Sequence, residues 1–225
     1  MTELGKIEKP DVSAFKEGRK LYLVPLISPV NEPPAFKKKE EERSPEDKEE
    51  LELCSQYRER FNKYWDEAWN QINNLEAKIG EIRKIYYEQV LDEGEKGIKL
   101  IEETNEKSYQ IIKSKLEKGA KLQATEKSQI LNEIADCESC LLLGLRSQKV
   151  REFIFKAYEE AIKERNSCIS DQIDKTLEDN EAGALFIREG HQVQFPSGIH
   201  VFYVAPPALD EIHRWLRDQT ISKTT

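Results

Sequence analysis

The sequence lacks the apolar segments that would attach a protein to a membrane or export it. No apolar run approaches the roughly 18 residues of a membrane-spanning helix, so we predict no transmembrane segment and no membrane partner. The opening residues, MTELGKIEKPDVSAFKEGRK, contain no apolar core of the kind that marks a secretory signal peptide. The sequence therefore predicts a cytoplasmic protein.

The common catalytic signatures are also missing. The sequence contains no Gly-x-Ser-x-Gly nucleophile motif, no His-Glu-x-x-His zinc motif, no Walker loop and no Gly-x-Gly-x-x-Gly fingerprint. The large hydrolase, zinc-protease and nucleotide-binding classes that these motifs define are thereby disfavoured. We predict no cofactor.

Charge, by contrast, is plentiful and its balance is acidic. Charged residues make up 35% of the chain, against an average of about 25%. The mean hydropathy is -0.72, and the intermixed Glu and Lys are typical of long solvated helices. The net charge of -8 repels phosphate, which counts against general binding to nucleic acid or anionic membranes. Lys37–Lys39, Arg214 and Arg217 would provide a local basic patch only if the fold brings them together.

Hydrophobic spacing predicts a mixed α/β fold that is rich in helix. Apolar residues three and four apart indicate long amphipathic helices at 46–79, 126–143 and 147–178. Shorter helices are predicted at 93–105, 108–116 and 208–219, and strands at 21–27, 82–90, 183–189 and 199–207. Pro25 favours an edge position for the first strand. We expect a small sheet layer at the C-terminal end, or two small layers bridged by the long helices.

The predicted elements divide the chain into four regions. These are a flexible N-terminus (1–19), an N-terminal helix-rich α/β region (20–145) with an exposed linker (28–46), a long helix with a C-terminal α/β layer (146–220), and a tail (221–225). The apolar stripe of the helix at 147–178 is interrupted by Arg165 and Asn166.

The four cysteines, Cys54, Cys137, Cys140 and Cys168, all lie in segments predicted to be helical. We expect reduced thiols, because no secretory signal precedes them. Cys137 and Cys140 have a spacing that suits zinc or a redox pair, but no second Cys-x-x-Cys and no His-x-x-x-His supplies further ligands. The pair also lies late in a helix, away from the helix start that lowers a thiol pKa. We interpret both as buried structural cysteines, with metal binding as the alternative.

All three histidines, His191, His200 and His213, lie in the stretch FIREGHQVQFPSGIHVFYVAPPALDEIHRWL. If Pro196-Ser197-Gly198 formed a hairpin turn, His191 and His200 would lie about three residues, or roughly 10 Å, apart along the ladder, too far to share one metal. If the two strands are parallel neighbours, His191 lies in their connection and its distance from His200 is not fixed. Packing or surface exposure is the first interpretation of each. His200 is the candidate catalytic residue, because the start of a strand can open into a pocket.

Aromatic residues on the first long helix and near the C-terminus are the candidate partner contacts. An aromatic stripe on a long helix suits a protein partner or a second copy of the chain, and it equally suits packing within the monomer. The candidate contact residues are Trp65, Trp69, Tyr203, Pro206 and Trp215.

The segment ISDQIDKTLEDNEAGALFIREGHQVQFPSGIHVFYVAPPALDEI (169–212) resembles the C-terminal part of archaeo-eukaryotic peptide chain release factors and their bacterial relatives. The shared order is a helix, an acidic link ending in Glu-Ala-Gly, a strand, another strand and a closing helix. The Gly-Gly-Gln motif of that family is absent, so peptidyl-tRNA hydrolysis is not implied. The resemblance implies a role linked to the ribosome.

Three functional hypotheses follow. The first is a non-enzymatic interaction or regulatory protein that binds a protein partner through its long helices and C-terminal layer. The second is a translation- or ribosome-associated factor that binds RNA. The third is an enzyme that uses His200 with an acidic partner.

Overall fold

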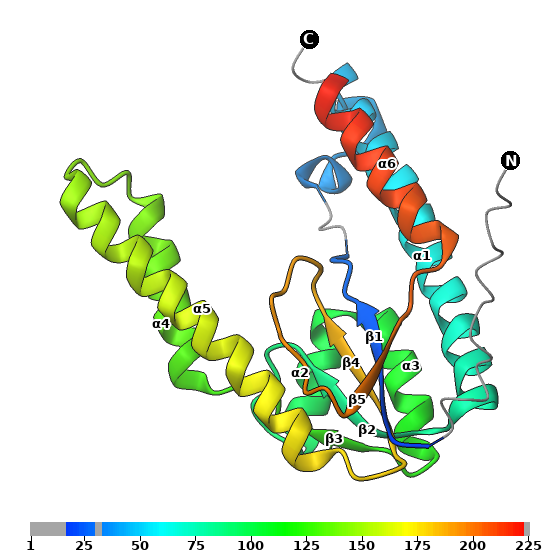
Figure 1. Cartoon of the computed structure of the whole chain (residues 1–225). Coiled ribbons are helices and arrows are strands. Elements are labelled where there is room, and N and C mark those ends of the chain that lie inside the picture. Colours follow the sequence, from blue (N-terminus) through cyan, green and yellow to red (C-terminus); the bar gives the residue numbers. More distant parts are fainter. Residues whose placement is uncertain (1–16, 30–32, 223–225) are drawn as a thin grey trace, which may run out of the picture.

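A computed structural model describes residues 17–29 and 33–222 of the chain. Five parallel strands form one sheet with the order β3-β2-β4-β1-β5 (Figure 1). The strands are β1 (Arg19–Pro25), β2 (Ile82–Tyr87), β3 (Lys121–Gln123), β4 (Ala182–Ile187) and β5 (Ile199–Tyr203). The helix-rich mixed α/β class is confirmed.

Helices cover both faces of the sheet. They are α1 (Pro45–Ile79), α2 (Glu95–Thr104), α3 (Glu106–Glu117), α4 (Ser128–Leu142), α5 (Gln148–Thr176) and α6 (Pro207–Ser222), with short 3-10 helices η2 (Pro34–Lys37) and η3 (Glu40–Glu42). Side chains alternate along a strand, so Tyr22 and Val24 pack toward α1, α2, α3 and α6, whereas Leu21 and Leu23 pack toward the C-terminal half of α5. Burial on both faces is usual for a parallel sheet.

The long helix α1 begins where the sequence predicts it. The Ser44 hydroxyl accepts the Asp47 amide at 3.2 Å, and the Asp47 carboxylate accepts the Ser44 amide at 2.9 Å. Pro45 occupies the first turn, where its missing N–H costs nothing. The helix ends before Gly80, whose φ of 142° favours glycine.

The sheet corrects two expectations. β1 lies inside the sheet, between β4 and β5, and not at its edge. Pro25 is tolerated because it is the last residue of the strand. The sheet is also not confined to the C-terminal end, since β4 pairs with β1 and β2. One sheet therefore joins the two regions predicted at 20–145 and 146–220.

The hairpin between the last two strands does not form. β4 and β5 run parallel and are separated by β1, so residues 188–198 form a connection across the sheet. His191 lies in that connection, as the parallel alternative predicts, but the two strands are not neighbours. The predicted N-terminus (1–19) and tail (221–225) lie largely outside the described residues.

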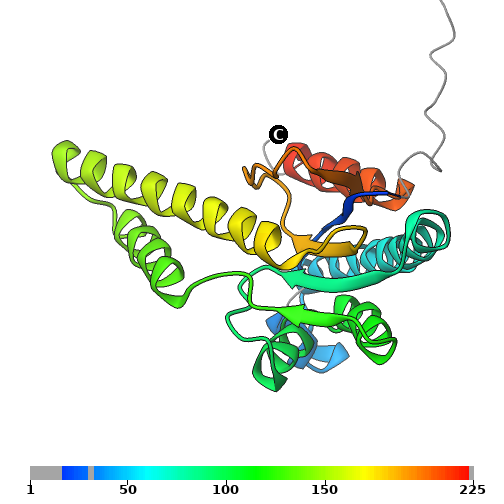
Figure 2. The same cartoon turned by 60° about the horizontal axis from the view of Figure 1, so that its bottom comes forward.

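Helices α4 and α5 form an antiparallel hairpin that we call the arm. Figures 1 and 2 show it projecting from the sheet, with the C-terminal half of α5 against the sheet and the α4–α5 turn at the far end. Within residues 17–29 and 33–222, no helix has both the length and the apolar character needed to cross a membrane.

Candidate functional site

The arm has a core only near its base. Ile130 and Ile134 of α4 are buried against Ala161 of α5, and Tyr158 and Ile162 pack beside them. Closer to the sheet, α5 continues with Ile169 and Ile173, which belong to the main core. The base of the arm is therefore held by ordinary hydrophobic packing.

The outer arm, defined here as residues 135–160, has no buried residue. It nevertheless carries many large apolar side chains. Among these, the exposed fractions are 87% for Leu142, 80% for Leu143, 71% for Phe153, 51% for Phe155 and 44% for Val150. The two helices of the outer arm therefore share too few contacts to cover their own apolar groups, and a concentration of this kind indicates an interaction surface.

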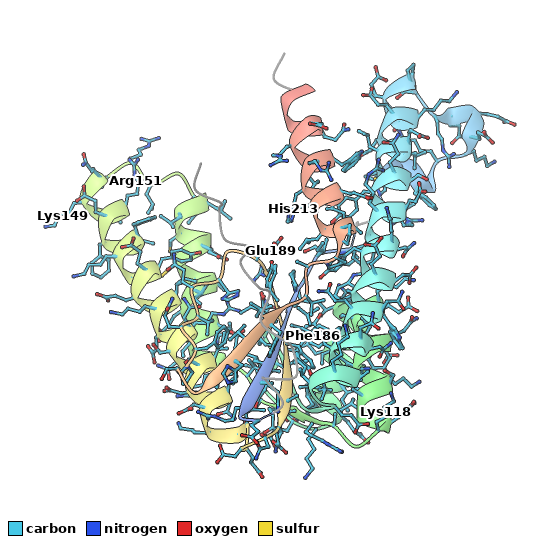
Figure 3. All side chains as sticks on the ribbon, turned by 45° about the vertical axis from the view of Figure 1, so that its right-hand side comes forward. Lys118, Lys149, Arg151, Phe186, Glu189 and His213 are labelled. Atoms are coloured by element: carbon cyan, nitrogen blue, oxygen red, sulfur yellow. The ribbon has the colours of Figure 1, made fainter. Side chains whose placement is uncertain are left out.

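The tip of the arm, defined as residues 142–156, is basic. It contains four basic residues and one acidic residue, Glu152, which gives it a net charge of +3 in a chain whose total is -8. Figure 3 shows Lys149 and Arg151 at the far end of the arm. Arg146, Lys149 and Arg151 have no ion pair within the described part of the chain. The tip thus combines apolar side chains with unneutralised positive charge.

A second candidate site lies at the carboxyl ends of β2 and β4. Four residues form an ion network that we call the carboxyl-edge network: Glu88 after β2, Arg188 after β4, Glu126 before α4 and Arg165 on α5. The Arg165 guanidinium donates to both Glu126 oxygens at 2.7 Å and lies 3.6 Å from Glu88. Arg188 donates its Nε–H to Glu88, and its amide donates to the same carboxylate at 2.6 Å.

Both carboxylates of the network are buried, and burial controls its electrostatics. Glu88 and Glu126 are only 5% and 6% exposed. Burial opposes the charged form of Arg165, but the bonds and charges of Glu126 and Glu88 outweigh it and raise the arginine pKa. The arginine therefore stays charged between its two carboxylates.

Backbone strain marks the same place. Gln89 follows Glu88 and has a φ of 67°, an uncommon conformation for a residue other than glycine. Its amide donates to the Glu126 carboxylate at 2.9 Å. The buried network holds this conformation, and strain of this kind concentrates at functional sites.

No protein-family model, no curated protein and no solved structure matches this chain.

The structure places the predicted contact tryptophans mainly inside the fold. Trp65 is 2% exposed and belongs to the core, so it presents no surface to a partner. Trp69 is partly buried, with the Lys115 ammonium 5.8 Å from its ring centroid. Trp215 packs against Tyr57 at a centroid distance of 5.9 Å and joins α6 to α1.

Tyr203 is the most accessible of the predicted contact residues, whereas Pro206 is buried at the start of α6. The Tyr203 hydroxyl donates to Glu189 at 2.8 Å, and burial, followed by that bond, raises its pKa. Glu189 also contacts His213 at 2.6 Å, a pair that Figure 3 shows between the 188–198 connection and α6. The predicted contact residues therefore do not form one surface.

His200 lies on the exposed edge strand β5 and lines neither of the two cavities at the carboxyl edge of the sheet. His200 is near the start of β5, so it lies toward the amino-terminal ends of the parallel strands, whereas both cavities lie at their carboxyl ends. His191 lines both cavities instead. The sequence placed it correctly in the connection but contained no signal that the connection begins beside the carboxyl end of β2.

Cys137 and Cys140 lie one turn apart on α4 and are partly exposed, so the prediction that they are buried is wrong. Partial burial, with Cys140 next, raises the pKa of the Cys137 thiol, so it stays protonated at neutral pH. Within the described residues, no three His, Cys, Asp or Glu side chains gather in a way that could hold a metal ion.

Proposed function

We propose that this protein is a non-enzymatic binding protein that contacts a partner protein through the tip of its arm. One observation carries the proposal: the outer arm contains large apolar side chains and no buried residue. Isolated exposed hydrophobic residues are normal on protein surfaces, but several at the end of one projecting hairpin indicate a surface that a partner covers.

The charge of the tip defines the partner's chemistry. Arg146, Lys149 and Arg151 are interspersed with the apolar residues along the chain, so we expect the complementary surface to combine apolar groups with carboxylates. Partner binding would bury Leu142, Leu143 and Phe153 at the centre, where truncation has its largest effect on affinity.

Replacing Leu142, Leu143 and Phe153 by serine should abolish partner binding and leave the fold intact. We expect the affinity to fall by at least about 100-fold, since loss of a single hot-spot side chain costs about 2 kcal/mol or more. The partner would be recovered from the native cell with tagged wild-type chain, purified, and titrated against both forms by calorimetry. Unchanged circular dichroism and thermal midpoint would show that the variant is folded.

The matched control replaces Leu91 and Leu100, which are 44% and 38% exposed outside the arm, by serine. This control should bind the partner as the wild type does. Equal losses in both variants would contradict the proposal. Light scattering on the purified chain would show whether the partner is a second copy of the chain. If the chain dimerised through the tip, a homodimer would replace the proposal of a different partner protein.

RNA is a second candidate partner, and the basic tip favours it. Phe153 and three unneutralised cations give the tip the combination of stacking surface and positive charge that single-stranded RNA requires. The patch considered from the sequence is less suitable, because Lys38 is paired with Asp47 at 2.8 Å and Glu40–Glu42 lie nearby in the chain. A role linked to the ribosome would use this surface.

Replacing Arg146, Lys149 and Arg151 by glutamine should weaken binding of a fluorescent single-stranded RNA. We expect the slope of log K against log salt concentration to shrink by about 2, because each phosphate contact contributes roughly 0.7. The control replaces Lys96, Lys113 and Lys118, which lie outside the arm. Absence of RNA binding by the wild type at low salt would eliminate this candidate and leave the protein partner.

A further inference from the structure

A cavity of about 1300 Å³ lies between the base of the arm and residues 188–194. Its walls come from α4, α5, the end of β2 and the connection that follows β4. This volume exceeds that of most small-molecule pockets, so a small molecule would occupy only part of it. The inner wall consists of Glu88, Arg165, Asn166, Arg188 and His191.

The sheet topology opens a crevice at this position. The connection from β2 to β3 runs through α2 and α3, which pack on the α1 face of the sheet. The connection from β4 to β5 runs over the α5 face, where Val193 packs with Ile169 and the Ser170 hydroxyl donates to the Gln194 carbonyl at 2.6 Å. The chains leaving two neighbouring strands thus diverge, and ligands of open parallel sheets bind at such points.

Both oxygens of each carboxylate in the carboxyl-edge network already accept a hydrogen bond. Glu88 accepts the amide and the Nε–H of Arg188. Glu126 accepts the Gln89 amide and two N–H groups of Arg165. Neither carboxylate has an oxygen left without a donor. The two arginines of the network balance the charge of its two glutamates. The inner wall is therefore not an acidic site that would attract a cation.

The nitrogen donors of the inner wall are not saturated. The Arg188 guanidinium is 60% exposed and uses only Nε, which leaves both Nη groups free among the described residues. His191 accepts the Val193 amide at Nδ1 at 3.3 Å, so its neutral ring carries the proton on Nε2. Asn166 is 8% exposed, lines the cavity and makes no side-chain hydrogen bond within residues 17–29 and 33–222. Its amide is therefore available to a molecule in the cavity.

We propose that this cavity binds a small molecule through a single carboxylate or phosphate group, held by Arg188, Asn166 and His191. The ligand's oxyanion supplies the acceptors that these three donors lack, and hydrogen bonds between charged groups are about twice as strong as neutral ones. The inference stands apart from the proposed function of the arm tip, since it uses none of the tip residues.

The outer wall of the cavity, formed by exposed residues of α4 and α5, limits the ligand to one carboxylate or phosphate group. Glu138, Glu159 and Asp171 line the cavity and are exposed, with Lys163 as the only cation among the exposed residues of α4 and α5 that line it. A polyanion such as RNA would meet these carboxylates, whereas a compact molecule places its oxyanion on the inner wall and a neutral or cationic part against them.

The test titrates the ¹⁵N-labelled full chain with inorganic phosphate and, separately, with acetate, with sodium chloride at matched ionic strength as the reference. We expect saturable shifts of amides at 88–89, 165–166 and 188–193, with a dissociation constant on the order of 1 mM. Response to phosphate alone, or to acetate alone, would identify which oxyanion the site takes. Shifts confined to Arg146–Arg151, or none above those of chloride, would overturn the proposal.

Variants assign the binding to the inner wall. Asn166→Ala and Arg188→Gln should each lower the affinity for the oxyanion that binds the wild type by about tenfold or more. Asn166→Ala removes no side-chain hydrogen bond among the described residues, so it still tests the site if Arg188→Gln fails to fold. Asn70→Ala, at an exposed position of α1, is the control and should bind normally. Wild-type affinity in Asn166→Ala would contradict the assignment.

Discussion

Replacing Arg165 by methionine should lower the free energy of unfolding by about 3–5 kcal/mol, because the change removes the cation from between two buried carboxylates. Arg165 is 12% exposed and holds Glu126, whose side chain is 1% exposed, through two bonds of 2.7 Å. Methionine fills a similar volume and adds no strain. Urea denaturation followed by circular dichroism measures the loss.

The loss of stability comes from the buried carboxylate that remains without a counter-charge after Arg165 is replaced. Glu88 keeps Arg188 and its backbone donor, but Glu126 keeps only the Gln89 amide. A buried charge without a counter-charge costs much more than the intact pair contributes. The double variant with Glu126→Gln should therefore be more stable than Arg165→Met alone, which a double-mutant cycle would detect.

Lys163→Met is the matched control, since Lys163 is exposed on the same helix two residues away. Its effect should stay within about 0.5 kcal/mol. A loss below about 1 kcal/mol for Arg165→Met would show that water reaches the network and that the carboxylates are not desolvated.

The helices could be predicted from the sequence because their periodicity is long and regular. The 35 residues of α1 repeat an apolar stripe over many turns, with Ser44, Pro45 and Gly80 at its ends. β3 was missed because its three residues, Lys121–Gln123, are too few to show a pattern. β1 was placed at an edge because a proline within a strand usually indicates one, yet Pro25 comes last and needs no ladder donor.

The two candidate sites were predictable to different degrees. The stripe of α5 shows a polar interruption at Arg165 and Asn166, and both residues line the cavity. The sequence could not identify their partners, because Glu88 and Arg188 are brought to them only by the strand order. The arm tip was missed for a different reason. An apolar stripe predicts burial of its residues, yet Val150, which belongs to the stripe of α5, is 44% exposed.

Replacing Lys115 by methionine should also lower the free energy of unfolding by about 3–5 kcal/mol. Lys115 is 3% exposed on α3, and its ammonium donates to Glu76 at 2.6 Å and to Asn73 at 2.8 Å, both on α1. The same ammonium lies over the Trp69 ring. This residue therefore joins the two helices through contacts that methionine cannot replace.

Glu76 determines the size of this effect. Its side chain is 10% exposed, and without Lys115 its carboxylate keeps only the Ile82 amide at 3.1 Å. Lys115→Met should therefore lower the free energy of unfolding more than Lys115→Met combined with Glu76→Gln, since the double variant leaves no charge buried.

Lys113→Met, at an exposed position of α3, is the control and should change stability by less than about 0.5 kcal/mol. Chemical denaturation of the four proteins gives the comparison. If the double variant were as unstable as Lys115→Met, the loss would come from packing on Trp69 and Asn73, and not from the unpaired carboxylate.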